Sequence, residues 1–269
     1  MAAPSKTAPA VAIPNQTERF ATPSTPGHQP GALPAQPRRK SLMRKYEVAS
    51  LNPDGTVRHS DHIAPASEDF EVAFAGFAHG TMIATPQGPR AVEDIAPGTM
   101  VETNQDHALP VQWVGKMMLV PTAPVDNPIQ LRLTRIMADS FGLSRPSPDL
   151  VLGHGARLLR SPAALREYAM QTDILTPARA FVDGISAIAI TPPTPVALYH
   201  IGLPHHAIIR AAGLEVESYH PGTSLLRDMG HNTRSLFLSL FPHITSQGGF
   251  GPLSYSRATQ NTLEQLGLV

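Results

Sequence analysis

The chain contains no cysteine among its 269 residues. Disulfides, thiolate metal sites and cysteine nucleophiles are therefore excluded together. Net charge is absent as well: 21 Lys and Arg balance 21 Asp and Glu, which argues against a nucleic-acid binder, because such proteins carry a net basic footprint. The apolar runs fall short of the roughly 18–20 residues that a membrane-spanning helix needs, so no membrane span is expected.

The N-terminus also lacks the basic segment followed by an apolar stretch that is typical of a secretory signal. We therefore expect a cytoplasmic location. Apolar residues make up 42% of the chain and charged residues 16%, a balance that favours a globular protein over a charged disordered one.

The first 45 residues differ in composition from the rest. Ala, Pro, Thr, Ser and Gln dominate residues 1–37, and such a segment cannot bury enough apolar surface to offset the entropy of ordering it. We predict a disordered tail over residues 1–45. Its end carries a basic cluster that is either a solvated patch or a contact for an anionic partner, formed by Arg38, Arg39, Lys40, Arg44 and Lys45.

From Tyr46 onward the pattern is mainly β. The residues YEVASLNPDGTVRH predict a hairpin, because Pro53 presets a turn and Gly55 tolerates positive φ. A short helix is expected around Phe70, and strands separated by turn residues follow to residue 222. We expect a β domain over residues 46–222 and a helical C-terminal appendage over 223–269, with helices near 224–229 and 234–241.

Several ordered blocks carry a more specific signal. They are GFAHGTMIATPQG at Gly76–Gly88, VEDIAPGTMV at Val92–Val101, PVQWVG at Pro110–Gly115, DLVLGHGARLL at Asp149–Leu159, LTPARAFVDG at Leu175–Gly184 and YHIGLPHHAIIRAAGLEVESYHPG at Tyr199–Gly222. Together these blocks resemble bacterial Hedgehog/intein (Hint) domains, which are self-processing modules. The resemblance implies a strongly curved, mainly β fold with a few short helices, whose core begins at residue 76.

The resemblance also implies a chemistry that this chain is not equipped to perform. A Hint domain cleaves the peptide bond before its first residue by attack of a cysteine thiol, assisted by a histidine. Gly76 stands at the position of that cysteine and Ala156 at the position of that histidine, while Gly153 replaces a polar residue. The primary hypothesis is therefore a catalytically degenerate domain that acts as a non-enzymatic binding or scaffold module for a protein or small-molecule partner.

A second hypothesis keeps residual self-processing by a rewired site. Thr81 supplies a hydroxyl near the nominal cleavage point, and His206 matches the family's histidine in its strand. If residues 154–156 lie in a strand, His154 faces the same side as Ala156 and could replace it. This hypothesis predicts scission near residues 74–77.

A third hypothesis is a histidine metal site built from His200, His206 and His220, with Glu217 as a nearby carboxylate. No His-Glu-x-x-His spacing is present, and no other cofactor is expected.

Overall fold

The computed structural model describes residues 42–105, 107–125, 127–169, 173–244 and 249–268, all within one compact unit that covers residues 40–269. The predicted disordered tail lies outside the described residues except for its last four positions. The last three of these positions belong to strand β1 (Met43–Leu51), which begins three residues before the predicted start at Tyr46. Arg44 and Lys45 of the basic cluster are thus part of the sheet. Arg44 forms an ion pair with the buried Glu71 at 2.6 Å, and Lys45 forms one with Asp61 at 2.9 Å.

The predicted hairpin is confirmed. Strand β1 pairs antiparallel with β2 (Val57–Pro65), from Met43 opposite Pro65 to Leu51 opposite Val57. Gly55 adopts a φ of +82° in the connecting turn, where a side chain would be strained.

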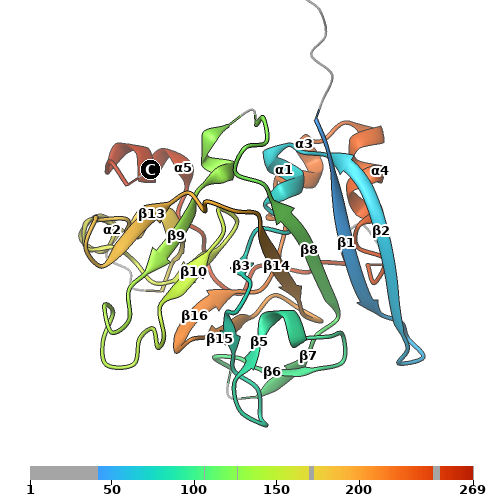
Figure 1. Ribbon diagram of the computed structural model, residues 1–269, viewed down its shortest axis with the longest axis horizontal. Helices are drawn as coiled ribbons and strands as arrows, with labels where there is room; N and C mark the ends of the chain where they lie inside the picture. The colour runs from blue at the N-terminus through green and yellow to red at the C-terminus, as the bar shows by residue number, and fades with distance from the viewer. Residues whose placement is uncertain (1–41, 106, 126, 170–172, 245–248, 269) are drawn as a thin grey trace, which may run out of the picture. The chain divides into compact units, whose positions relative to one another are not determined.

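This hairpin forms one edge of an eight-stranded sheet (Figure 1) with the order β13-β9-β10-β3-β14-β8-β1-β2. All its pairings are antiparallel. The other strands of the sheet are β3 (Phe77–Ala78), β8 (Trp113–Leu119), β9 (Leu133–Ile136), β10 (Leu150–Leu152), β13 (Ala187–Ile190) and β14 (Val196–Gly202). Strand β3, only two residues long, thus occupies the middle of the sheet between β10 and β14.

A six-stranded antiparallel sheet has the order β12-β11-β16-β15-β4-β5, and a two-stranded sheet pairs β6 with β7. Their strands are β4 (Met82–Ile83), β5 (Arg90–Ala91), β6 (Met100–Glu102), β7 (Ala108–Pro110), β11 (Arg157–Leu159), β12 (Leu175–Pro177), β15 (Ile208–Ala211) and β16 (Leu214–Glu217). The mainly β character expected from the sequence is confirmed.

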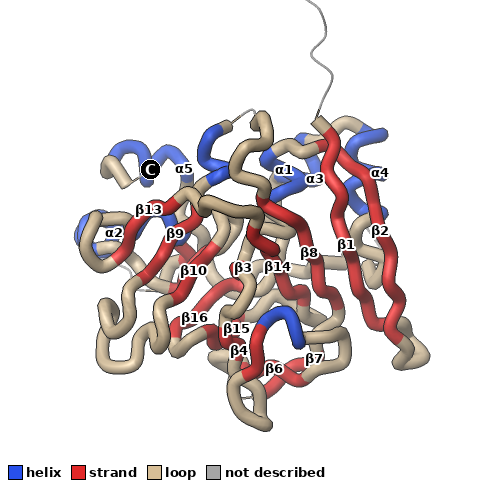
Figure 2. Tube along the Cα trace, in the orientation of Figure 1, coloured by secondary structure: helices blue, strands red, loops and turns tan. Residues whose placement is uncertain are grey.

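Helices are short and lie between or after the strands (Figure 2). The α-helices are α1 (Glu68–Glu71), α2 (Ala163–Ala169), α3 (Leu225–Asp228), α4 (His231–Ser239) and α5 (Gln260–Gln265), and the 3₁₀ helices are η1 (Val92–Asp94), η2 (Pro128–Leu131) and η3 (Ala178–Phe181). Within the region where the sequence predicted strands, η2 forms instead, because Asn127 accepts from the Ile129 N–H and the Gln130 side chain accepts from the Asn127 N–H in return.

Two hydrophobic clusters hold the strands together. The larger lies between the main sheets, and the second gathers most of the aromatic residues around Trp113, which is fully buried. Helix α4 contributes Phe237 and Phe241 to this second cluster, and the Trp113 indole N–H donates to the Leu240 carbonyl at 2.7 Å. The segment predicted as a C-terminal appendage therefore packs as part of the core. Leu236 of the same helix lies at the edge of this cluster and is 37% exposed.

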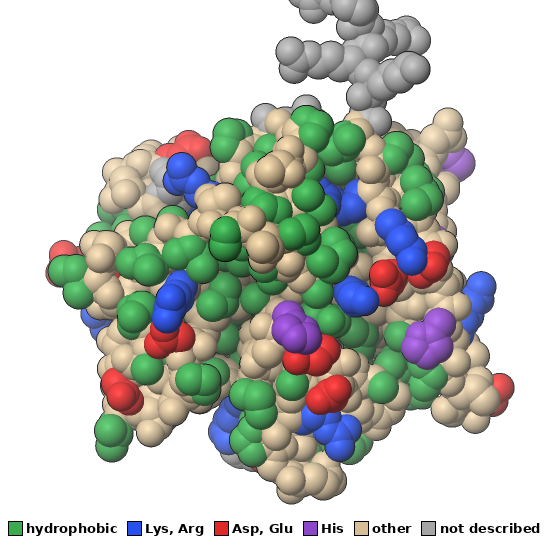
Figure 3. Space-filling view, viewed as in Figure 1, with side chains coloured by type: hydrophobic (Ala, Val, Ile, Leu, Met, Phe, Trp, Pro, Cys, Tyr) green, Lys and Arg blue, Asp and Glu red, His purple; other side chains and the backbone are tan. Residues whose placement is uncertain are grey.

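Charged side chains of both signs are interspersed over the face seen in Figure 3, in keeping with the balanced composition. Lys116 and Lys45 both contact Glu47 on this sheet, for example. Across the described ranges, no helix has the length and apolar character required to traverse a bilayer.

Candidate functional site

The peptide between Ala75 and Gly76, the nominal cleavage point, lies at the start of β3 inside the large sheet. The Gly76 N–H donates to the Tyr199 carbonyl at 3.1 Å. On the other side, the Gly76 carbonyl accepts from the Gly153 N–H at 2.8 Å and the Ala75 carbonyl accepts from the Gly155 N–H at 2.8 Å. Each of these polar groups has a backbone partner, as buried peptide groups require.

Gly76 has no room for a side chain. A Cβ built on it would stand 2.7 Å from Cδ2 and 2.9 Å from Cγ of His200, and 2.9 Å from the Tyr199 carbonyl oxygen. The imidazole of His200 is 3% exposed and makes edge contacts with Phe77 and Tyr219, so it is packed on several sides. A cysteine at position 76 would need both this ring and the neighbouring backbone to move.

The turn between β10 and β11, residues 153–155, is called the glycine turn below. A Cβ on Gly153 would lie 2.4 Å from the Ala75 carbonyl oxygen, and one on Gly155 would lie 2.4 Å from the Val72 carbonyl oxygen. Only glycine permits so close an approach of one backbone to another. The polar side chain that the family carries at position 153 would therefore not fit here.

His154 lies in the glycine turn and not in a strand, so the condition under which it would face the same side as Ala156 is not met. Its imidazole is 7% exposed, and neither ring nitrogen has a hydrogen-bond partner among the described residues. Burial lowers the pKa of His154 to about 3, with the charge of Arg179 adding to the effect. The ring is therefore neutral and a poor base. Ala156 is 1% exposed and belongs to the larger hydrophobic cluster.

Thr81 precedes β4 and is 6% exposed. Its hydroxyl donates to the Ala78 carbonyl at 2.7 Å, which closes the turn after β3. The same turn is held by Glu93, whose carboxylate accepts from the Gly80 N–H at 2.9 Å. Within the part of the chain that the structure describes, the Thr81 hydroxyl makes no hydrogen bond to a histidine or a carboxylate that could act as its base.

His206 lies in a second polar cluster, called the Glu217 network below and formed by Arg157, His206, Glu217, Ser254 and Arg257. The Ser254 N–H donates to Nδ1 of His206 at 2.9 Å, so Nε2 carries the proton and donates to Glu217 at 2.8 Å. Arg257 reaches the same carboxylate at 2.9 Å and Arg157 at 3.4 Å. Burial would raise the pKa of Glu217, but the hydrogen bond from His206 and the two guanidinium groups lower it to about 2.

The predicted metal candidates are not arranged as a ligand set. The Gly222 N–H donates to Nδ1 of His220 at 2.9 Å, and Nε2 of His220 lies 2.9 Å from the Gly251 carbonyl, to which it donates. With His206 also bonded at both nitrogens, two of the three imidazoles offer no free lone pair. The described residues contain no group of three His, Cys, Asp or Glu side chains placed to hold a metal ion.

A sequence model of the Hint domain matches residues 75–223, more than half of the chain. The chain belongs to the Hint-domain family. Among solved structures it is similar to a bacterial intein-like domain from Clostridium thermocellum, at 15% identity and a TM-score of 0.35, over 54% of this chain and 99% of that one. No curated protein matches the chain.

The sequence predicts Gly76 and Ala156 as the nominal catalytic positions of this Hint domain but does not reveal most of the Glu217 network. Arg257 and Ser254 come from the segment after residue 222, where no motif marks them as partners of residues in β15 and β16. Glu217 was singled out only as a possible companion of a metal. Strand β16 carries two acidic residues, Glu215 and Glu217, at alternate positions. Strand alternation would place both on one face, so the sequence gives no signal that Glu217 alone is buried.

Proposed function

We propose that this Hint domain does not cleave itself and serves as a non-enzymatic binding module. The observation that carries the proposal is the closed space at Gly76, where the His200 ring and the Tyr199 carbonyl fill the position of a Cβ. A self-processing site must hold a nucleophile against the preceding carbonyl. Here that position has neither a nucleophile nor the volume to accept one.

Backbone donors remain around the nominal scissile peptide. The Gly155 N–H still bonds the Ala75 carbonyl at 2.8 Å, a contact that could polarise it. Polarisation alone does not break a peptide bond, because an attacking group and a proton acceptor are also required. We interpret these bonds as structural links between β3 and the glycine turn.

The alternative, residual self-processing, lacks a suitable base. The Thr81 hydroxyl is engaged by Ala78, and His154 has its pKa lowered to about 3. His206 is bonded at both nitrogens within the Glu217 network. None of the three side chains is free to activate an alcohol or a water molecule, which supports the non-catalytic reading.

The test is an intact-mass time course of the purified full-length chain, with and without hydroxylamine. We expect an unchanged mass in both, because no ester intermediate forms for hydroxylamine to intercept. A Gly76→Cys variant should also remain whole, since the thiol has no room beside His200. A fragment ending near Ala75, in the wild type or with hydroxylamine, would overturn the proposal.

A further inference from the structure

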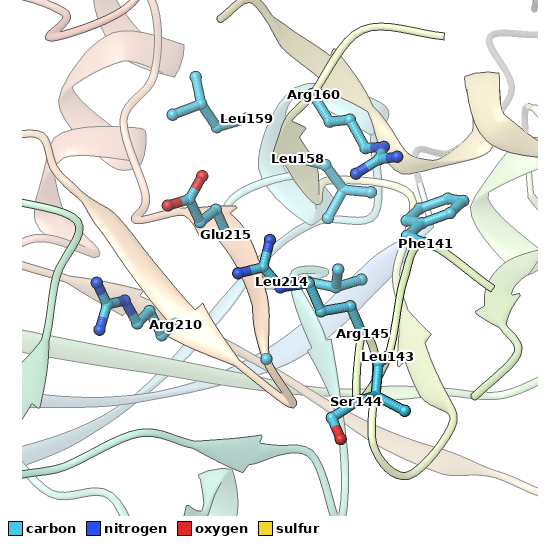
Figure 4. Close-up of a pocket in the computed structure, with 11 residues that line it drawn as sticks. Phe141, Leu143, Ser144, Arg145, Leu158, Leu159, Arg160, Arg210, Leu214 and Glu215 are labelled. Atoms are coloured by element: carbon cyan, nitrogen blue, oxygen red, sulfur yellow. The ribbon is translucent and has the colours of Figure 1, made fainter. Parts of the chain in front are cut away.

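A pocket of about 420 Å³ opens between β11, the end of the β15–β16 hairpin and the loop that precedes β10. Phe141, Leu158 and Leu214 give it an apolar lining, and Arg145, Arg160 and Glu215 add charge. Figure 4 shows Arg145 extending across the pocket toward the strand that carries Leu214, with the Arg160 guanidinium group beside Phe141. The volume suits a small organic ligand.

The walls of this pocket are held in place by an unusual backbone. Asp139, Ser144 and Ala212 have φ values of 60°, 57° and 46°, and they are the only residues other than glycine with positive φ in the described part of the chain. The Ser147 N–H donates to the Ala212 carbonyl at 3.0 Å, and Gly213 lets the Ser144 carbonyl approach to 2.5 Å from where a Cβ would be. Strained backbone of this kind gathers at functional sites, where it fixes a binding geometry in advance.

The charges in the pocket are not neutralised from within. The guanidinium carbon of Arg160 lies 4.6 Å from the centre of the Phe141 ring, a stacking contact that orients the group without neutralising it. Neither Arg145 nor Arg160 has an ion-pair partner among the residues that the structure describes. Partial burial lowers the pKa of Arg160, and the nearby charges of Arg166 and Arg145 add to the effect.

The remaining charges do not neutralise Arg145 and Arg160. Arg210 at the pocket edge lies 3.7 Å from Glu102 and is thereby occupied. Glu215 is exposed and makes no ion pair with Arg145 or Arg160 within 4.0 Å. Two guanidinium groups beside an apolar floor are a suitable receptor for an oxyanion that carries an apolar group, because guanidinium binds carboxylate and phosphate through paired hydrogen bonds.

We propose that this pocket binds a small organic oxyanion, a carboxylate or a phosphate attached to an aromatic or aliphatic group. The inference rests on the proposed function, since it names the ligand class that a Hint domain acting as a binding module takes. The charged group contacts Arg145 and Arg160, while the apolar group lies against Phe141, Leu158 and Leu214.

Calorimetric titration of the full-length chain tests the proposal with phenyl phosphate and phenylacetate as probes. Saturable binding of at least one probe is expected, with benzyl alcohol at least about tenfold weaker because it lacks the charge. Binding of phenyl phosphate alone or of phenylacetate alone identifies the preferred oxyanion. Absence of saturable binding by both probes, or equal binding of benzyl alcohol, would overturn the proposal.

Variants locate the site. The double variant Arg145→Gln/Arg160→Gln should weaken binding at least about tenfold, since each charge-assisted hydrogen bond contributes to affinity. Both side chains are exposed, so the fold should persist. The single variant Arg160→Gln should also bind the probe more weakly than the wild type. Arg58→Gln, an exposed arginine of β2, is the matched control and should bind as the wild type does. Glu215→Gln should strengthen binding by removing a repelling charge.

Unchanged binding in the double variant would rule out this pocket. The mass time course of the same samples reports separately on the proposed function. Self-cleavage with intact probe binding would contradict only the proposed non-catalytic function. A stable mass without probe binding would contradict only the proposed ligand pocket.

Discussion

The glycine turn and the Glu217 network contain two buried histidines in opposite surroundings. His154 has no hydrogen-bond partner among the described residues and is packed against backbone, whereas both nitrogens of His206 are bonded. Around His154, the glycines have no side chains, so one backbone can approach another closely. Around the second, opposite charges pair within hydrogen-bond distance.

The difference shows two ways in which a protein can fill the space of a chemical site. Near the nominal cleavage point, removing side chains closes the space without leaving a cavity, since the His200 ring and the glycine turn occupy it. In the Glu217 network, polar groups remain because each satisfies another, and removing one would leave a buried charge unpaired. Added side-chain volume should thus destabilise the glycine turn, and removal of a charge should destabilise the Glu217 network.

The largest effect is expected for Glu217→Gln. It removes the carboxylate that faces Arg157 and Arg257 but keeps the shape of the side chain. We expect a loss of about 3–4 kcal/mol in the free energy of unfolding, the lower part of the range for breaking a buried pair, because the two guanidinium groups keep some contact with water. Urea denaturation measures it. Glu102→Gln, at an exposed 3.7 Å pair with Arg210, is the control and should change little. Equal losses of stability in the two variants would show that the Glu217 network depends on its charge no more than an exposed ion pair does.

Gly155→Ala tests the closed backbone of the glycine turn. The added Cβ would lie 2.4 Å from the Val72 carbonyl oxygen, which belongs to the backbone and has little freedom to yield. We expect a loss of about 2–3 kcal/mol, typical of overpacking.

Gly230→Ala is the matched control for that change. A Cβ there meets nothing within 4 Å, and φ is −63°, so no strain arises. Its cost should be well below that of Gly155→Ala when both are measured by thermal and urea denaturation. If the two variants unfold alike, the glycine turn is not packed as described.

His154→Leu sharpens the contrast through its dependence on pH. Burial holds the pKa of His154 at about 3 in the folded chain, below its ordinary value of 6.5. The folded state then stays neutral while the unfolded state takes up a proton, so the wild type loses stability as pH falls from 6.5 toward 3. This single group should lower the free energy of unfolding by about 2 kcal/mol at pH 5 relative to pH 7.5. The leucine variant has no titrating group at this position and should lack this loss.

The measurement is urea denaturation of both proteins between pH 7.5 and pH 5. At pH 7.5 the variant should be at least as stable as the wild type, because an unpartnered polar group has been replaced by an apolar one. Parallel loss of stability in the two proteins would show that His154 is not held neutral.

Local patterns made part of this structure predictable. The alternation around the Asn-Pro-Asp-Gly turn predicted the β1–β2 hairpin, and the ordered motifs predicted the Hint family. The assignment of Gly76 and Ala156 to the nominal chemical positions stays a prediction. These features depend on residues that are near one another in the chain or on a recognised block order.

The closure of the site could not be predicted in the same way. His200 reaches the space beside Gly76 only because β14 pairs with β3, and Arg257 meets Glu217 only after the chain has turned back from its C-terminal segment. Arg145 and Arg160 likewise share a pocket through the fold and not through a sequence motif. Side-chain contacts between distant segments depend on the three-dimensional arrangement, which periodicity does not specify.

The smallest effect concerns Thr81, the one hydroxyl near the nominal cleavage point that the sequence offered as a nucleophile. Thr81→Val removes its 2.7 Å hydrogen bond to the Ala78 carbonyl while nearly preserving its shape. We expect a loss of about 1 kcal/mol, the net worth of one intramolecular hydrogen bond. Thr85→Val removes a comparable bond to the Gly88 carbonyl, together with a long 3.3 Å bond from the Gln87 N–H, from a side chain buried to a similar degree. The two variants should therefore lose similar stability and stay whole in the mass time course. A change in scission for Thr81→Val alone would assign the hydroxyl a chemical role that its bond to Ala78 argues against.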